Sequence, residues 1–388
     1  MVTPAPFPPR RPAERSSVIV LVLVSMLFTA AALTAFIEKA GNDLLVEVRQ
    51  ADAKRLRQEA FSVLEVTLAV LEDFRQADGG LHSAAEGWSD PLGWAGWAPS
   101  ENRTVDVSFQ DESGKIPLRR ADMNTLTNLF VYWQMSPSDA EKLADALEGW
   151  MQTGHVYTSA LAPDYQDATI PYAEPARPMR SFSELASVAY AREVFFDENG
   201  LPNELFWRFV NDVSIFNYSQ PNANGANGDV MAALGQYTDA QRQHIGDYLS
   251  GTGQYAQQGQ NYFMNSGTLG AVAGLGGNAN VFGTTISALR VNITIHDGRS
   301  QYRLSAVVSP QGGATINQTN ATNPAAAASM STSSASTSVT NTTQPSSRAT
   351  GAKAAAAASQ SINYPFTVLE IVEDDEIPQA PPAAPPPS

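Results

Sequence analysis

The chain has 388 residues, and 24 Lys and Arg against 39 Asp and Glu give it a formal net charge of -15 at pH 7. A strongly acidic protein repels nucleic-acid phosphates and anionic membrane surfaces, so no nucleic-acid partner is expected. The sequence contains no Cys, which excludes disulfides, thiolate metal sites and cysteine nucleophiles. The length is sufficient for two or three domains.

An uncharged apolar run extends from Ser16 to Ile37. Its roughly 22 residues, at about 1.5 Å each, would span the hydrocarbon core of a bilayer. Because basic residues favour the cytoplasmic side, the leader is expected in the cytoplasm and the rest of the chain beyond the membrane. A cleaved secretory signal is the alternative, but its apolar region is usually about 7–15 residues long. The basic residues of the leader are Arg10, Arg11 and Arg15.

The helical pattern continues beyond the apolar run. From Glu38 to about Gln76 there is no Pro, and the only Gly is Gly41. Apolar residues recur at spacings near three, four and seven while charged residues occupy the other positions, which predicts an amphipathic helix, the stalk. Gly79 and Gly80 supply a stop signal.

The remainder predicts a mixed α and β head. Alternation over 104–109 indicates a strand that ends in the turn 111–114, and two helical patterns follow in 123–151. Period-two patterns on either side of His296-Asp297-Gly298-Arg299 predict a β-hairpin, and 364–372 a last strand. Regions rich in small and polar residues predict flexible or disordered segments.

These patterns give ten segments in chain order. They are a cytoplasmic leader 1–16, a transmembrane helix 17–37, an amphipathic stalk 38–78, the first part of the head 79–118, an α-helical insert 119–215 that could extend to about 250, a flexible loop 250–280, a hairpin 281–311, a disordered Ala/Ser/Thr insertion 312–361, a final strand 362–377 and a Pro-rich tail 378–388.

Several local patterns in this order resemble the K-type minor pseudopilins of type II secretion systems, the general secretion pathway protein K family. The run 15–21 resembles the prepilin processing region of that family, and 107–116 is similar to its strand leading into D-E-x-G-x-I. Residues 145–150, with Trp150, resemble its first helical hairpin, and 178–185 its P-F-R-S-x-E-E-L segment. The resemblance covers most of 10–310 and the last strand.

The resemblance implies an α+β fold: a pilin-like N-terminal transmembrane and stalk helix, and an antiparallel sheet head with a large α-helical insert of helix-hairpin-helix or SAM-like type. It implies a non-enzymatic subunit that caps the tip of the periplasmic pseudopilus, helps to initiate its assembly and limits its length during export of folded proteins across the outer membrane. The implied partners are I-type and J-type minor pseudopilins, prepilin peptidase and the inner-membrane assembly platform. The implied location is the bacterial inner membrane, with a single pass and a periplasmic head.

The resemblance also assigns the processing residues. Prepilin peptidase would cut between Ser16 and Ser17, with the Ser17–Val18 bond as the alternative, although the family usually has Gly where Ser16 stands. The fifth mature residue would then be Leu21, where most pilin-like subunits carry Glu to meet the free amine of a neighbour. An apolar residue there suits a subunit with nothing above it.

No cofactor is expected. Many relatives carry closely spaced Asp residues for calcium near the position of Trp150, but this sequence has Gln152, Thr153 and Gly154 there. Its four His residues lack metal-site spacing and are expected on the surface. They are His82, His155, His244 and His296.

Two other classes of protein remain open: a membrane-anchored periplasmic binding protein or hydrolase, and a minor pilin of a type IV pilus system. The tryptophans at 88, 94 and 97 either bind carbohydrate or fill the seam between stalk and head, the commoner use of such a cluster. The size of the helical insert favours the pseudopilin over the smaller type IV minor pilins.

Overall fold

The computed structural model describes residues 14–100, 103–159, 161, 163–166, 171–298, 300–316 and 365–374, and of 14–17 the backbone only. Nearly all of the predicted leader, most of the Ala/Ser/Thr insertion 312–361 and the tail 378–388 lie outside these residues. The chain divides into two compact units, Met1–Ser62 and Val63–Ser388, which are described separately.

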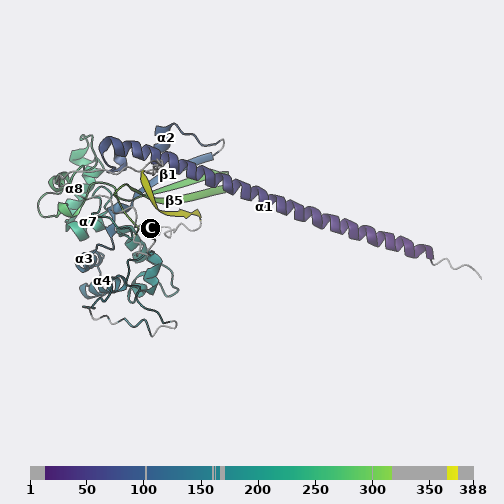
Figure 1. Ribbon diagram of the computed structural model, residues 1–388, viewed down its shortest axis with the longest axis horizontal. Helices are drawn as coiled ribbons and strands as arrows, with labels where there is room; N and C mark the ends of the chain where they lie inside the picture. The colour runs from purple at the N-terminus through teal and green to yellow at the C-terminus, as the bar shows by residue number, and fades with distance from the viewer. Residues whose placement is uncertain are drawn as a thin grey trace, which may run out of the picture. The chain divides into compact units, whose positions relative to one another are not determined.

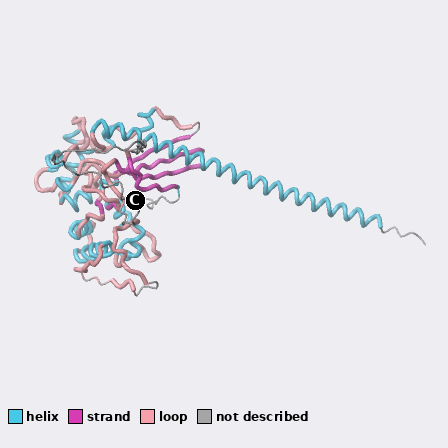
Figure 2. The backbone as a smooth tube through the Cα atoms, viewed as in Figure 1, coloured by secondary structure: helices cyan, strands magenta, loops and turns pink. Residues whose placement is uncertain are grey.

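A single helix, α1, extends over Glu14–Asp78 (Figures 1 and 2). This is the continuous helix that the absence of Pro predicted. Within the first unit, its apolar side chains from Val18 to Ile37 are exposed. Within the second unit, Val63, Leu64, Val70 and Leu71 are buried at spacings of one, six and one, which places them on one helix face. This face packs into the second unit.

The second unit contains a four-stranded antiparallel sheet in the order β1-β4-β5-β6. Its strands are β1 (Arg103–Asp111), β4 (Leu289–Asp297), β5 (Ser300–Pro310) and β6 (Phe366–Glu373). Alternate residues of β4 are buried, and Ile293 is paired with both Val107 and Leu304. The predicted hairpin and last strand are therefore confirmed. Arg299 of the predicted turn lies outside the described residues.

The chain between β1 and β4 forms the helical domain, in which α3 and α4 make the predicted helical hairpin (Figure 1). Asp122 and Ser136 cap these two helices by accepting hydrogen bonds from backbone N–H groups three residues on. The core is aromatic, with Phe130, Phe195 and Phe209 fully buried. The α-helices are α3 (Met123–Tyr132), α4 (Pro137–Met151), α5 (Ala191–Phe195), α6 (Glu204–Asp212), α7 (Gly228–Gly235), α8 (Asp239–Leu249) and α9 (Ser266–Ala273).

The structure corrects the prediction of a flexible loop at 250–280. This segment contains α9, and Phe263 and Leu269 are fully buried. Phe263 stacks on Tyr248 of α8 with ring centroids 4.6 Å apart. Two well-placed apolar side chains therefore order a segment that its Gly, Asn and Gln content marked as a linker.

Short elements complete the second unit. The Trp-rich stretch forms α2 (Pro91–Ala95) after a 3-10 turn, η1 (Ala84–Glu86). The segment after Ser181 forms a 3-10 helix, η3 (Phe182–Ser187). The turn after β1 is η2 (Glu112–Gly114), and η4 (Gly253–Tyr255) and η5 (Ala279–Val281) flank α9. A parallel pair, β2 (Ile116–Pro117) and β3 (Val213–Ser214), joins the segment just after β1 to the segment just after α6.

Candidate functional site

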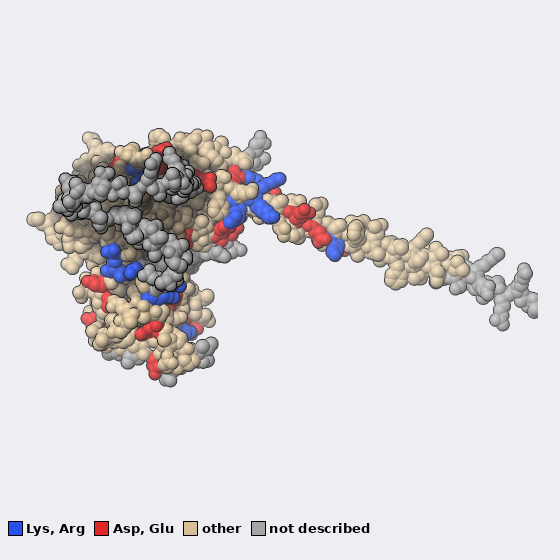
Figure 3. All heavy atoms as spheres, viewed as in Figure 1, with Lys and Arg blue, Asp and Glu red and all other residues tan. Residues whose placement is uncertain are grey.

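The N-terminal part of α1 presents a continuous apolar surface. Among the described residues, α1 is the one helix long and apolar enough to cross a membrane. Figure 3 shows this uncharged stretch and the basic residues that follow it further along the helix. Arg49, Lys54 and Arg55 of that basic group are exposed. A helix with this composition and exposure is suited to contact lipid or other apolar helices.

The predicted processing residues lie at the start of this helix. Ser16 and Ser17 are within α1, and their side chains lie outside the described residues. Leu21 is 71% exposed. On this exposed apolar surface Leu21 could contact lipid, or it could be the fifth mature residue, where most pilin-like subunits have Glu. Its assignment as the fifth mature residue stays a prediction.

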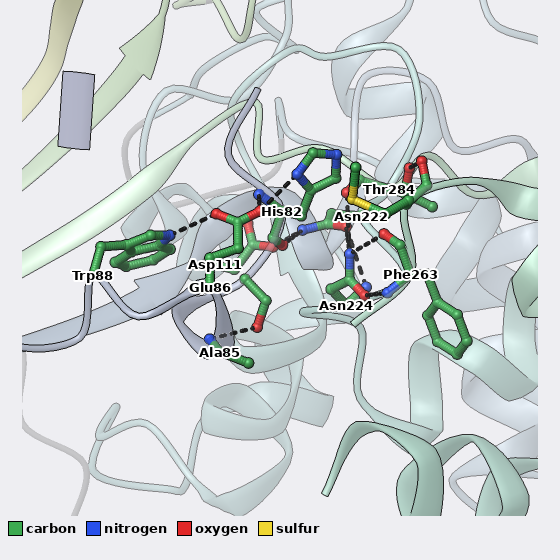
Figure 4. Close-up of polar contacts among 11 residues, drawn as sticks. His82, Ala85, Glu86, Trp88, Asp111, Asn222, Asn224, Phe263 and Thr284 are labelled. Atoms are coloured by element: carbon green, nitrogen blue, oxygen red, sulfur yellow. Dashed lines mark hydrogen bonds and ion pairs between the residues drawn. The ribbon is translucent and has the colours of Figure 1, made fainter. Parts of the chain in front are cut away.

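The turn after β1 forms the joint between the sheet and the helical domain. Asp111 Oδ1 accepts hydrogen bonds from the backbone N–H and hydroxyl of Ser113 at 2.8 and 2.6 Å. Asp111 Oδ2 accepts one from Asn222 Nδ2 at 2.6 Å (Figure 4). Burial raises the pKa of Asp111 to about 6, although these hydrogen bonds act in the opposite direction. The carboxyl group thereby links the end of β1 to a loop about 110 residues later in the chain.

We call the segment 213–227, which connects α6 to α7, the strap. Close backbone approach explains its glycine: a Cβ on Gly225 would lie 2.6 Å from the Cβ of Asp111. A Cβ on Gly114 would meet the backbone of Gly225 and would lie 2.9 Å from the backbone nitrogen of Ala226. These distances are too short for any side chain. The strap and the 111–114 turn therefore pack backbone to backbone.

Buried charges hold the other side of the same turn. Glu112 receives Lys115 Nζ at 2.9 Å and Arg290 Nε at 2.6 Å, and its side chain is 4% exposed. Burial opposes its ionisation, but the two cations hold the pKa of Glu112 below its ordinary value. The Tyr218 hydroxyl donates toward the carbonyls of Glu112 and Lys115, at 2.9 and 2.7 Å. The D-E-x-G turn, Asp111–Gly114, therefore connects β1, β4 and the strap, and we call this turn with its partners Lys115, Tyr218, Asn222 and Arg290 the lock.

The segment after α1 joins this lock. Glu86 accepts hydrogen bonds from His82 Nδ1 at 2.6 Å and from Trp88 Nε1 at 2.8 Å (Figure 4). The carbonyl of His82 accepts one from Asn222 Nδ2 at 3.0 Å. Trp88 is buried edge-on against Phe109 of β1, with centroids 5.0 Å apart. His82, Glu86 and Trp88 thus form a structural cluster at which the segment after α1 contacts both β1 and the strap.

Trp94 and Trp97 follow Trp88 in the chain, and Trp94 contacts α1 at the seam between the stalk and the head. Trp94 of α2 makes an edge-on contact with Phe74 of α1, with centroids 5.5 Å apart, and is 64% exposed. Trp97 is half-buried. The contacts of Trp88 and Trp94 favour the seam over a carbohydrate platform.

The expectation of surface histidines needs correction for His82, which is 4% exposed. Its partner Glu86 is four residues away in η1, outside any α-helix, so no local sequence pattern predicted the pair. His155 is also partly buried and lies 2.6 Å from a carboxylate oxygen of Asp145. His244 is exposed and His296 intermediate.

Near Trp150 the structure shows a buried carboxylate that sequence reasoning did not single out. Asp145 accepts hydrogen bonds from Thr158 N, Ser159 N and the Ser159 hydroxyl in addition to the His155 contact. Burial opposes its ionisation, yet these donors hold the pKa of Asp145 below its ordinary value. Its oxygens are thus used to fix the loop after α4. Gln152, Thr153 and Gly154 are exposed.

The described residues contain no group of three or more His, Asp or Glu arranged to hold a metal ion. The carboxyl groups of Asp111, Asp145 and Glu112 bind backbone groups, hydroxyls or oppositely charged partners. A long apolar N-terminal helix, an antiparallel sheet and an inserted helical domain are the elements of a pilin-like α+β fold.

A comparison with family models finds a match to part of the chain. Residues 107–196 match the model of type II secretion system (T2SS) protein K. The matched segment runs from β1 through the 111–114 turn and α4 to α5. The match confirms the resemblance to the K-type minor pseudopilins that the sequence suggested.

The search of curated proteins gives no match. Among solved structures, the chain is similar to one in the crystal structure of the GspK-GspI-GspJ complex from the enterotoxigenic Escherichia coli type 2 secretion system. The sequence identity is 13% and the TM-score 0.44, and the similarity covers 67% of this chain and 92% of that chain.

Proposed function

We propose that this K-type minor pseudopilin caps the tip of the type II secretion pseudopilus, helps to start its assembly and limits its length. The observation that carries the proposal is the helical domain. It occupies the whole of 112–288, between two strands that are direct neighbours in the sheet. An insertion of this size adds bulk that would obstruct stacking of a further subunit on the same head.

The surface of α1 supports the same role. Leu21 is apolar and exposed, so in a bilayer it offers nothing to neutralise the amine of a subunit above it. The exposed apolar face that surrounds it suits packing against similar helices from subunits below. The partners proposed on this ground are the I-type and J-type minor pseudopilins, with prepilin peptidase and the inner-membrane platform acting earlier in assembly.

The proposed location is the bacterial inner membrane, crossed once by α1. The three leader arginines favour a cytoplasmic N-terminus, and the acidic second unit would then lie in the periplasm. Because the chain has no Cys, single-cysteine variants can report the orientation without background. A cysteine at Ser100 should react with a membrane-impermeant maleimide in cells whose outer membrane has been permeabilised, and a cysteine at Arg10 should not. The reverse labelling pattern would contradict the topology.

Capping is tested by measuring pseudopilus length in a strain that lacks this chain. Electron microscopy of overproduced pseudopili should show fewer and longer filaments without the chain, and restoration of the normal number and length when it is supplied. Antibody labelling should place the chain at one end of each filament. Labelling along the filament length, or unchanged filaments in its absence, would contradict the proposal.

A further inference from the structure

A second buried carboxyl group lies where the strap leaves the helical domain. Asp212, the last residue of α6, is fully buried. Its Oδ1 accepts hydrogen bonds from Asn227 Nδ2 at 2.6 Å and from Asn211 Nδ2 at 3.4 Å. Asn227 is the N-cap of α7, so one carboxyl group connects the end of α6 to the start of α7. These two points are the two ends of the strap.

The other oxygen of Asp212, Oδ2, is buried without a hydrogen-bond partner among the described residues. The Asp229 carboxyl group of α7 is its acidic neighbour and, after burial, contributes to the raised pKa of Asp212. Two carboxylates are both acceptors, so a hydrogen bond between them requires that one carry a proton. Asp212 Oδ2, which has no other partner among the described residues, is the oxygen on which we place this proton.

The surroundings decide which of the two acids is ionised. Asp229 Oδ2 accepts hydrogen bonds from Arg208 Nε at 2.6 Å and from Trp133 Nε1 at 3.1 Å. Although burial opposes its ionisation, these partners hold the pKa of Asp229 below its ordinary value. Asp212 has amide donors only, and burial, with the charge of Asp229, raises its pKa to about 7. Arg208 of α6 and Asp229 of α7 are the charged groups that face Asp212.

We propose that Asp212 and Asp229 share one proton and form a pH-sensitive latch, which holds the two ends of the strap together when protonated and loosens them when the proton is lost. When Asp212 ionises, two adjacent carboxylates repel each other, and among the described residues the guanidinium of Arg208 alone offsets their charge. The strap is the segment whose Asn222 and Gly225 contact the lock at Asp111. Loosening its ends therefore weakens the attachment of the helical domain to the sheet.

The sign of the pH effect follows from proton linkage. Asp212 in the unfolded chain titrates near its ordinary value of 3.8 and in the folded chain at about 7. The stabilising effect of the proton is fully present below pH 3.8, the pKa of Asp212 in the unfolded chain. It is lost as the pH rises through about 7, the pKa in the folded chain. Between these values folding takes up one proton, so the folding equilibrium constant falls up to about ten-fold per pH unit from this group.

The test compares the full chain in detergent micelles with Asp212→Asn, whose neutral amide can donate to Asp229 at every pH. Asp73→Asn, which changes an exposed carboxyl group of α1, is the matched control. Urea unfolding between pH 5 and pH 7 should show wild type losing stability relative to Asp212→Asn by up to about a hundred-fold in the folding constant. The Asp73→Asn variant should follow wild type. A difference between wild type and Asp212→Asn that does not change with pH would overturn the proposal.

A second measurement uses wild type alone and therefore does not depend on the folding of a variant. In wild type labelled with ¹³C at the aspartate carboxyl carbon, one resonance should titrate near pH 7. Amide hydrogen exchange of the strap should accelerate across the same pH range beyond the intrinsic increase. If no aspartate titrates near pH 7, or if strap protection does not follow that titration, the latch does not exist.

Discussion

The contact between Gly114 and the strap gives the sharpest test of the lock, through the substitution Gly114→Ala. The added Cβ would lie 2.9 Å from Ala226 N and closer still to the carbonyl group of Gly225. Because non-bonded contacts are optimal at about 3.5–4.0 Å, the strap would have to move by roughly 1 Å. Such a movement would stretch the 2.6 Å hydrogen bond between Asn222 and Asp111 beyond the usual limit of about 3.2 Å.

The expected cost combines two effects. Overpacking of a close-packed interior typically costs about 1–3 kcal/mol. Loss of a hydrogen bond adds about 1 kcal/mol. We therefore expect Gly114→Ala to lower the free energy of unfolding by roughly 3 kcal/mol, a large share of the roughly 5–15 kcal/mol of a typical domain.

The assay is urea unfolding of the full chain in detergent micelles, followed by tryptophan fluorescence. Trp88 lies in the adjacent seam and Trp133 in the helical core, so the signal reports both parts. Gly246→Ala is the matched control, because a Cβ on Gly246 in α8 meets no atom within 4 Å. It should stabilise the protein by up to about 1 kcal/mol through helix propensity. A Gly114→Ala variant within about 0.5 kcal/mol of wild type would refute the reasoning.

Three further predictions concern the seam, the buried charges and the membrane helix. Trp88→Ala should lower the unfolding free energy by about 3–5 kcal/mol, and the exposed Trp94→Ala by far less; equal losses would contradict the assigned packing. Glu112→Gln leaves the buried Lys115 without its carboxylate and Arg290 with Glu370 as its remaining one, and it should cost about 3–5 kcal/mol in the same urea assay. Asp106→Asn should cost almost nothing, because the Asp106 side chain is 78% exposed. Leu21→Glu should disfavour membrane insertion by about 2–4 kcal/mol, seen as a smaller carbonate-resistant fraction, and an unchanged fraction would argue against a lipid-facing position.

The regular elements could be predicted because their signals are local. α1 follows from a long run without Pro, and β4 with β5 follows from strict alternation around a turn at Gly298. The D-E-x-G turn after β1 was also visible, since Asp111 caps it within two residues.

The lock could not be predicted from the sequence because its partners are far apart in the chain. Asn222 and Gly225 belong to a Gly- and Asn-rich stretch of the kind that usually forms a linker, and only the folded chain brings them to Asp111. Phe263 was missed for the same reason: Asn224 bonds both its backbone N–H and its carbonyl, so tertiary contacts rather than local pattern order that segment. The carboxyl group of Asp212 gave no signal either, because burial cannot be read from a single acidic residue.

Co-purification tests most directly the proposal that this chain acts as a K-type subunit within a tip complex of minor pseudopilins. The full chain would be co-expressed with the I-type and J-type minor pseudopilins of the same organism and extracted in detergent. Size exclusion with light scattering should then give one complex whose protein mass corresponds to one copy of each subunit. Elution of this chain as a monomer, separate from a complex of the other two, would contradict the account.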